Sequence, residues 1–254
     1  MNILHLSIVV LVFVVFVVLS IFVYINRNEK STRRNLPDTV IPLSNMPVNE
    51  CNKLIYVGDK FGYETDLDPV DHEPTYETSI TNMSFATPNN ERGVRNVLMD
   101  SISEKWRKTF DKYLPKDIKG TFPTSTFFKR YTVNERVDIP PHRDDCAYAV
   151  VVQVSSPVEV TGGEFYIYPI GSEQGESLTQ LFPNQRREVL KNSKSIPIVQ
   201  LKQGEVVLYK GDCHIHGVLP VTKGIRHALI YFYGGFEKRL PGYKPYDYKS
   251  ARGY

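Results

Sequence analysis

The chain has 254 residues, of which 41% are hydrophobic, and a formal net charge of +3 at pH 7. This length and hydrophobic content suffice for one sizeable buried core, which excludes a disordered chain and favours one domain with an appendage. The mildly basic charge includes no long run of like charges, so we expect no nucleic-acid partner.

The N-terminal segment 3–25 (ILHLSIVVLVFVVFVVLSIFVYI) is apolar apart from His5 and two serines. As a helix it would be about 34 Å long, enough to cross a bilayer core. It lacks the basic start and the small-residue cleavage site of a signal peptide. We therefore expect a single-pass transmembrane anchor in residues 1–26, which would make this a membrane protein.

The side of the membrane that faces the rest of the chain stays open. Basic residues follow the span and none precedes it, which favours the cytosol by the positive-inside rule: Arg27, Lys30, Arg33 and Arg34. The sequon at Asn82 would have a role in a secretory lumen.

Residues 27–90 are rich in proline and show little periodicity, so we interpret them as a juxtamembrane connector and N-terminal segment. Within this segment, NKLIYVG (52–58) predicts a short strand. Further along, apolar residues recur three and four positions apart, which predicts an amphipathic helix whose aromatic stripe packs on a core: Val94, Val97, Leu98, Ile102, Trp106, Phe110, Tyr113 and Leu114, with Asn89 or Asn90 as its cap.

After Gly120 the helical pattern gives way to short β-rich runs separated by turn glycines. Several short strands without intervening helices predict a mainly β fold, an antiparallel barrel or jelly roll, within a domain spanning 91–240. The runs are 125–133, 146–154, a region around 164–171, 195–201, 204–210, 213–219 and 226–234. Residues 241–254 are expected to form a tail.

The polar stretch 172–194 is too long for a tight turn and predicts a loop. Its basic residues suggest a substrate-side lid, with an ordinary solvated loop as the alternative: Arg186, Arg187, Lys191 and Lys194. The sequence gives no indication of the oligomeric state.

The three cysteines are too few and too scattered for a disulfide framework or a zinc site. We expect them to be mostly reduced. Pairing of Cys146 with Cys213 stays open, because each lies close in sequence to a candidate metal ligand.

The stretch PPHRDDCAYAVVVQV (140–154) places His142 and Asp144 two positions apart at the start of an apolar strand. Residues i and i+2 of a strand face the same side, so both side chains can reach one point. His216 lies on a later strand bounded by turn glycines. Two histidines and one carboxylate with open positions are the ligands of non-haem Fe(II) oxygenases. A surface ion pair of Asp144 with Arg143 is the alternative.

A second element strengthens the metal interpretation. Arg226 follows His216 by ten residues across a Thr-Lys-Gly turn, which brings a guanidinium to the neighbouring strand. A guanidinium in a metal pocket is suited to a dicarboxylate, which indicates 2-oxoglutarate. The spacing to Arg226 and to Pro220 selects His216 over His214, and His227 should point away from Arg226.

Three motifs in order, YTVNERVDIPPHRD, TGGEFYIYP and LKQGEVVLYKGDCHIHGVLPVTKGIRHALIYF, resemble the catalytic core of 2-oxoglutarate and Fe(II)-dependent dioxygenases over residues 120–236. The resemblance is to the prolyl and lysyl hydroxylase branch. It implies a double-stranded β-helix, flanked here by the amphipathic helix and the transmembrane helix. It also implies that His142, Asp144 and His216 bind iron, that Arg226 binds the distal carboxylate of 2-oxoglutarate, and that Tyr131 helps to hold this cosubstrate.

The resemblance further implies that O2 and 2-oxoglutarate are consumed, that succinate and CO2 are released, and that a C–H bond is hydroxylated, with ascorbate as a candidate further cofactor. The expected substrate is a prolyl or lysyl residue of a peptide or protein, and a free small molecule or a glycan is the runner-up. Halogenating relatives lack the carboxylate, so the presence of Asp144 favours hydroxylation.

Two alternative functions predict other features in the sequence. An AlkB-type nucleic-acid dealkylase would carry a second arginine six residues after the first, and position 232 is Phe. A catalytically silent jelly-roll module displayed on a membrane would be expected to have a broken ligand set, whereas this set is intact.

Overall fold

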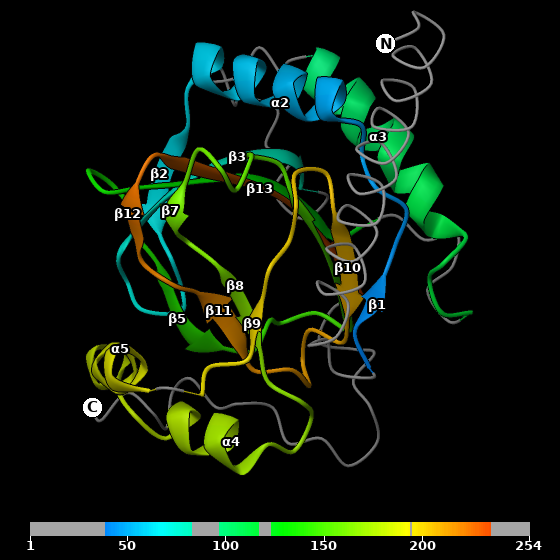
Figure 1. The fold of residues 1–254 in the computed structure, drawn as a ribbon. Coiled ribbons are helices and arrows are strands. Elements are labelled where there is room, and N and C mark those ends of the chain that lie inside the picture. Colours follow the sequence, from blue (N-terminus) through cyan, green and yellow to red (C-terminus); the bar gives the residue numbers. More distant parts are fainter. Residues whose placement is uncertain (1–38, 83–96, 117–122, 194, 235–254) are drawn as a thin grey trace, which may run out of the picture. The chain divides into compact units, whose positions relative to one another are not determined.

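The computed structural model describes residues 39–82, 97–116, 123–193 and 195–234 (Figure 1). The predicted transmembrane helix and the C-terminal tail lie outside these ranges. Among the helices described, none is both long and apolar enough to cross a membrane.

The larger of the two main sheets in the described part of the chain has seven strands in the order β1-β10-β6-β13-β4-β3-β2. All neighbouring strands in it are antiparallel. The strands are β1 (Ile41–Pro42), β2 (Glu64–Leu67), β3 (Pro74–Asn82), β4 (Ser125–Thr132), β6 (Tyr148–Gln153), β10 (Val206–Tyr209) and β13 (Ile225–Tyr233).

The smaller sheet has the strand order β5-β11-β8-β9, and a separate pair joins β12 to β7. These strands are β5 (Ile139–His142), β7 (Thr161–Gly162), β8 (Phe165–Ile167), β9 (Ile198–Val199), β11 (His216–Val218) and β12 (Val221–Lys223). The two larger sheets lie opposite each other (Figure 1), and side chains from both line one pocket. The expected mainly β, jelly-roll type of fold is confirmed.

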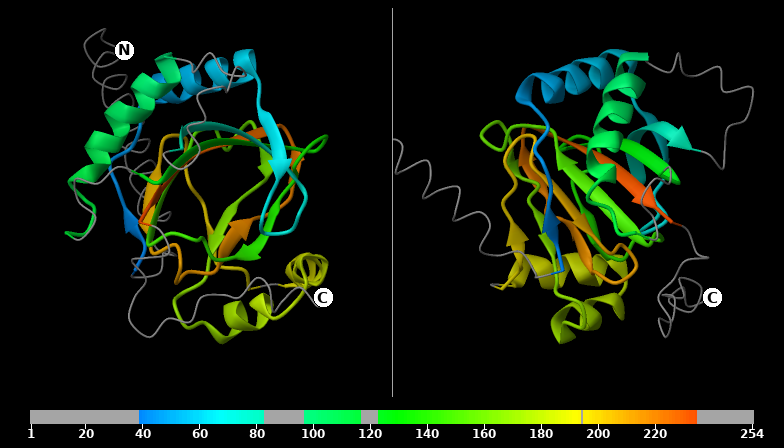
Figure 2. Two further views of the ribbon diagram at one scale, coloured as in Figure 1. Left: turned by 180° about the vertical axis from the view of Figure 1, so that it is seen from behind. Right: turned by 90° about the vertical axis from the view of Figure 1, so that its right-hand side faces the viewer.

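The two faces of the larger sheet differ because side chains alternate along each strand. On β13, Leu229, Tyr231 and Tyr233 point outward into the main hydrophobic cluster. Residues that alternate with them along the strand, such as Ala228 and Ile230, line the pocket. The outer face is covered by α2 (Val48–Phe61) and α3 (Val97–Asp111) (Figure 2).

The predicted amphipathic helix is confirmed as α3, and Trp106 and Phe110 are buried as expected. The predicted strand at 52–58 is wrong, because these residues belong to α2. Cys51, Leu54 and Val57 recur at helical spacing and are all buried against the sheet. Part of the segment interpreted as a connector thus forms α2, β2 and β3, and β3 pairs with β4.

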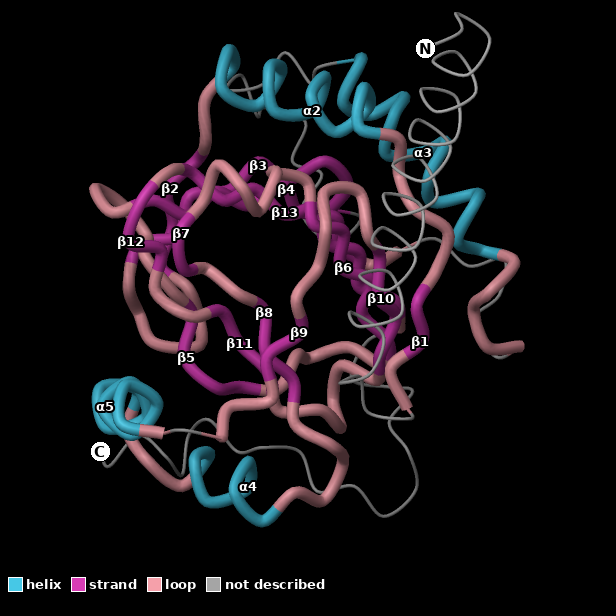
Figure 3. Tube along the Cα trace, in the orientation of Figure 1, coloured by secondary structure: helices cyan, strands magenta, loops and turns pink. Residues whose placement is uncertain are grey.

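The predicted loop at 172–194 is also wrong, because it contains α4 (Glu173–Thr179) and α5 (Pro183–Asn192) (Figure 3). Ser172 caps α4 by accepting a hydrogen bond from the Gly175 amide. α5 begins with a proline, which a first helical turn tolerates. Two apolar residues of this polar stretch, Leu178 and Leu190, are buried with Tyr166 and Tyr168, which lie on or next to the smaller sheet, whereas Phe182 and Val189 are exposed.

The three cysteines are buried and free, so Cys146 and Cys213 are not paired with each other. Burial is the main cause that raises the pKa of Cys51 to about 11 and that of Cys213 to about 12. Both thiols are therefore protonated at neutral pH.

Candidate metal centre

Three metal-capable side chains meet where β5 pairs with β11. In this antiparallel pair His142 lies directly opposite His216, and Asp144 follows β5 in a turn rather than on the strand itself. The carboxylate oxygens of Asp144 lie 3.4 Å from Nε2 of His142 and 3.3 Å from Nε2 of His216. One ligand atom from each residue lies within 4.8 Å of the others. The structure therefore brings together the three residues that the sequence singled out.

A close backbone approach holds Asp144 in this place. Its amide donates a hydrogen bond of 3.0 Å to the carbonyl of Gly211, in the connection from β10 to β11. A Cβ atom at Gly211 would lie 2.5 Å from Sγ of Cys146 and 3.0 Å from Cβ of Asp144. Only glycine fits at position 211 without moving the turn that carries Asp144.

Backbone carbonyls fix the orientation and the tautomer of both histidines. Nδ1 of His142 lies 2.8 Å from the carbonyl oxygen of Pro140, and Nδ1 of His216 lies 3.1 Å from that of His214. A carbonyl can only accept, so each Nδ1 carries a proton, and in the neutral form of each ring, which is the form that binds a metal, the lone pair is on Nε2. The two Nε2 atoms are those that face Asp144, and such second hydrogen bonds are typical of metal-binding histidines.

The carboxyl group of Asp144 is buried, which disfavours its charge, but the charges and hydrogen bonds of His216 and His142 outweigh burial and hold its pKa well below the ordinary value. The carboxylate is therefore ionised at neutral pH. Two imidazole nitrogens and one carboxylate on one side of a pocket fit Fe(II) with positions left for other ligands. The donor set of this chain thus agrees with the metal that the sequence implies.

Arg226 and Tyr131 lie directly opposite each other on β13 and β4. The central guanidinium carbon of Arg226 is 5.2 Å from the centre of the Tyr131 ring. Arg226 is only 2% exposed, and its Nε has no hydrogen-bond partner. Burial lowers the pKa of this guanidinium, an effect that nearby Tyr131 and Glu164 oppose. A buried cation without a carboxylate partner is arranged to receive an anion from outside the chain.

The metal-capable residues share one pocket with Arg226 and Tyr131. Its cavity volume is about 50 Å³. Asp144 is the only carboxylate among the described residues that line it. The remaining walls are mostly apolar and aromatic: Ile139, Val151, Phe165, Tyr209, Val218, Ala228, Ile230 and Phe232, with Lys129 as a further cation.

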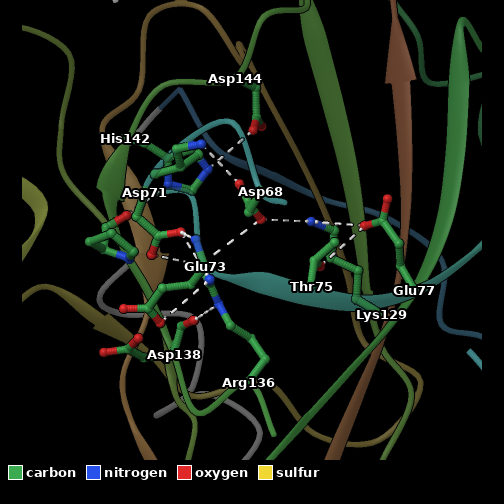
Figure 4. Close-up of polar contacts among 12 residues, drawn as sticks. Asp68, Asp71, Glu73, Thr75, Glu77, Lys129, Arg136, Asp138, His142 and Asp144 are labelled. Carbon is green, nitrogen blue, oxygen red and sulfur yellow. Dashed lines mark hydrogen bonds and ion pairs between the residues drawn. The ribbon is translucent and has the colours of Figure 1, made fainter. Parts of the chain in front are cut away.

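Lys129 reaches the pocket from β4 and pairs with two carboxylates (Figure 4). Its Nζ lies 3.1 Å from Glu77 and 3.4 Å from Asp68. In the sheet, Lys129 stands between Glu77 on β3 and Ala228 on β13. Burial disfavours the ammonium charge, but Glu77 and Asp68 outweigh it and raise the pKa of Lys129.

Two arginines extend this network toward β5, and Figure 4 labels one of them, Arg136. Arg136 donates two hydrogen bonds of 2.9 Å to the carboxylate of Asp71. Arg187 of α5 donates to Asp71 at 2.6 Å and to Asp138 at 3.0 Å. Asp138 directly precedes β5, so the network joins the β2–β3 turn, the strand that carries His142, and α5.

Arg186 forms a further link between α5 and β5. It is 4% exposed and donates hydrogen bonds to the carbonyls of Pro141 (2.8 Å), Leu181 (2.7 Å) and Thr179 (3.2 Å). Because Arg186 and Arg187 bond to groups of the chain itself, the structure does not agree with the hypothesis that they meet a substrate from a lid. Lys191 pairs with Glu188, and Lys194 lies outside the described residues.

The other candidate histidines have structural partners. His214 is fully buried, with Nδ1 2.9 Å from the Tyr168 carbonyl and Nε2 2.9 Å from the hydroxyl of Thr39. Both of its ring nitrogens are thus engaged, in agreement with the choice of His216. His227 stacks on Phe128 of the outer face and lies 3.2 Å from Asp59, so it does point away from Arg226.

Two pocket residues, Tyr209 and Lys129, were missed by the sequence analysis. Lys129 carried a usable signal, because it lies two positions before Tyr131 on one strand and must share its face. Tyr209 carried none, because a tyrosine that ends the run VVLY is typical of an ordinary buried strand. The alternative of a surface ion pair is wrong, because Asp144 is buried and its carboxylate lies against His142 and His216, and Arg143 pairs with Glu176 of α4.

No family model matches the chain. It is 27% identical over 143 residues to the curated protein "2-oxoglutarate and iron-dependent oxygenase domain-containing protein 2" of Xenopus tropicalis, a match that covers 56% of this chain and 36% of that protein. The chain thus spans about a third of the length of this relative.

Among solved structures, the fold is similar to an oxidoreductase of the 2OG-Fe(II) oxygenase family from Burkholderia pseudomallei, with 16% identity, a TM-score of 0.48, and coverage of 77% of this chain and 85% of the other. It is also similar to a prolyl hydroxylase from Trichoplax adhaerens in complex with a peptide fragment of the hypoxia inducible factor oxygen degradation domain. That match has 11% identity and a TM-score of 0.47, and covers 87% and 96% of the two chains.

The curated relative and the converging His142, Asp144 and His216 address the same question independently. The sequence match extends over 143 residues, whereas the geometry rests on three side chains. Together they support the resemblance: the chain is similar to a 2-oxoglutarate and iron-dependent oxygenase domain protein, and its donor set fits the metal that this name prints.

Proposed function

We propose that the chain is an Fe(II)- and 2-oxoglutarate-dependent dioxygenase that hydroxylates a C–H bond, with release of succinate and CO2. One observation carries this proposal: a metal-capable triad and a buried arginine whose Nε lacks a partner line the same pocket. A metal site alone or an anion site alone would fit many functions. Their combination fits a metal-bound dicarboxylate.

Each residue has a distinct task in this proposal. Nε2 of His142 and of His216 and the carboxylate of Asp144 would hold Fe(II), which with bound 2-oxoglutarate supplies the oxidising chemistry. Arg226 would bind the far carboxylate of 2-oxoglutarate, with its guanidinium placed over the Tyr131 ring. Buried walls such as Val151 and Phe165 would exclude water from the reacting atoms.

We propose a prolyl residue of a peptide or protein, rather than a lysyl residue, as the substrate. The partly exposed wall residues Ile230 and Phe232 offer apolar contact to a pyrrolidine ring. A lysyl ammonium would need a carboxylate in the wall, and the only one among the described lining residues, Asp144, is committed to the metal.

The test is succinate formation by the full-length chain in detergent with Fe(II), 2-oxoglutarate and ascorbate. Matched peptides would differ only in proline or lysine at one position. We expect succinate with the proline peptide, little with the lysine peptide, and none from His142→Ala, which loses one of three ligands. Faster turnover with the lysine peptide would contradict the substrate assignment. A wild-type chain that binds neither Fe(II) nor 2-oxoglutarate would favour a silent binding module instead.

We further propose that residues 3–25 anchor the chain in a membrane, on the strength of their length and apolarity. Retention of the chain in the membrane fraction after alkaline extraction is the expected result. Protease protection in sealed vesicles would show which side the catalytic domain faces.

A further inference from the structure

Tyr209 places a hydroxyl group against two of the three proposed metal ligands. It ends β10, is 2% exposed, and lines the pocket. Its hydroxyl oxygen lies 3.1 Å from Oδ2 of Asp144 and 3.1 Å from Nε2 of His216. Its ring centre lies 4.9 Å from that of His216. No other tyrosine in the described part of the chain bonds to these ligands.

A phenol has one proton to donate, so Tyr209 can serve only one of these acceptors at a time. Nδ1 of His216 donates to the carbonyl of His214, so the neutral ring has its lone pair on Nε2. If a metal takes that lone pair, Nε2 can no longer accept a hydrogen bond. Oδ2 of Asp144 is then the acceptor that is left for the Tyr209 hydroxyl.

The two oxygens of Asp144 have different surroundings. Oδ1 lies 3.4 Å from Nε2 of His142, whereas Oδ2 lies close to both His216 and the Tyr209 hydroxyl. A carboxylate can bind a metal through one oxygen or through both. A hydrogen bond to Oδ2 favours binding through Oδ1 alone, because Oδ2 then shares its charge with the phenol proton.

We propose that Tyr209 is a positioning residue that keeps Asp144 a one-oxygen ligand and thereby preserves the number of open positions on the metal. This inference rests on the proposed function, in which the same residues hold Fe(II). With three protein donor atoms, a six-coordinate metal keeps three positions open. A 2-oxo acid and O2 would need these positions, so a second oxygen from Asp144 would leave too few of them.

The test counts open positions directly, with Mn(II) as a probe in place of Fe(II). The electron paramagnetic resonance line of bound Mn(II) broadens in ¹⁷O-enriched water in proportion to the number of bound waters. The variant Tyr209→Phe keeps the ring and removes the hydroxyl. The matched control is Tyr231→Phe, which removes a buried hydroxyl that donates to the Ser103 carbonyl on the outer face of the sheet.

We expect three bound waters in the wild type and in Tyr231→Phe, and two in Tyr209→Phe. Without the hydroxyl, we also expect the affinity of the Mn(II)-loaded chain for 2-oxoglutarate to fall by about tenfold. A merely structural role of Tyr209 would lower the melting temperature without changing the water count.

Other results would overturn the proposal. Equal counts in wild type and Tyr209→Phe would show that Tyr209 does not control how Asp144 binds. A count that rises in the variant would show that Tyr209 is itself a ligand. Loss of Mn(II) binding in Tyr209→Phe with an unchanged melting temperature would make Tyr209 a determinant of affinity instead. Failure of the wild type to bind Mn(II) would count against the metal site itself rather than against Tyr209 alone.

Discussion

Lys129, whose side chain is 15% exposed, and Arg226, which is 2% exposed, are both cations in the wall of one pocket, yet they have opposite surroundings. Lys129 pairs with Asp68 and Glu77, whereas Arg226 has no ion pair or hydrogen bond with any residue that the structure describes and contacts the face of Tyr131. Burial alone therefore does not mark a binding residue. A buried charge that has ion-pair or hydrogen-bond partners within the chain stabilises the fold. A buried charge without such partners is suited to bind a ligand.

Arg186 is a third buried cation and is intermediate between these two. Its partners are backbone carbonyls, including that of Pro141 next to His142. Its guanidinium thus binds groups of the chain itself, and one of them lies next to His142, a proposed metal ligand. The three residues can be separated by substitutions that remove one charge at a time.

Lys129→Met should have the largest effect on stability. It leaves the buried carboxylate of Asp68 and that of Glu77 without their shared cation, which costs about 3–5 kcal/mol of unfolding free energy for a buried pair. The measurement is urea unfolding of the full-length chain in detergent. The matched control is Lys105→Met, whose pairing with Glu50 involves a side chain that is 60% exposed, and it should change stability by less than about 1 kcal/mol.

Two further results would test whether Lys129 stabilises the fold through its ion pairs. Adding Glu77→Gln to Lys129→Met removes one of the stranded carboxylates and should restore part of the lost stability. If Lys129→Met and Lys105→Met cost the same, Lys129 does not stabilise the fold through its buried ion pairs.

Arg226→Leu should weaken binding of 2-oxoglutarate without lowering stability. Stability should be unchanged or raised, because the variant removes a buried charge without a carboxylate partner. Binding of 2-oxoglutarate to the Mn(II)-loaded chain should weaken by about 2–5 kcal/mol, the typical effect of removing one member of a buried charge pair. Isothermal titration calorimetry measures the binding.

The control for Arg226→Leu lies on the other face of the same strand. Leu229→Ala truncates a fully buried residue of the main hydrophobic cluster and should cost about 2–5 kcal/mol of stability without changing 2-oxoglutarate affinity. A loss of stability in Arg226→Leu as large as in Lys129→Met would mean that Arg226 has a carboxylate partner after all.

These contrasts show where sequence reasoning succeeds for this chain. The strand runs and the amphipathic helix α3 were predictable, because alternation and helical spacing report directly on which face is buried. His142, Asp144, His216 and Arg226 were found through their residue types and spacing. Position on a strand sets the direction of a side chain, so His227 could be separated from Arg226 on the same basis.

Partners far away in the sequence were not predictable. Asp68 and Glu77 meet Lys129 only because β3 pairs with β4, and no local pattern encodes that pairing. α4 and α5 were not predictable because they bury few apolar residues. The contacts of α5 with β5 and the β2–β3 turn come from Arg186 and Arg187. The strand prediction for part of α2 was wrong because a short apolar run fits the periodicity of a strand as well as that of a helix.

Arg186→Met should have the smallest effect of the three, and on metal binding rather than on the cosubstrate. The guanidinium holds the Pro141 carbonyl, so its loss should loosen the end of β5 and the orientation of His142. Outer contacts that orient a ligand typically contribute 10- to 100-fold to metal affinity, and we expect a loss in this range for Mn(II), titrated well below the unfolding temperature. Lys191→Met, on the same helix and paired only with Glu188 among the contacts described, should leave the affinity unchanged.

A lower melting temperature of Arg186→Met with unchanged Mn(II) affinity would show that Arg186 supports α5 alone. A loss of affinity in Lys191→Met as well would show that any disturbance of α5 affects the metal site.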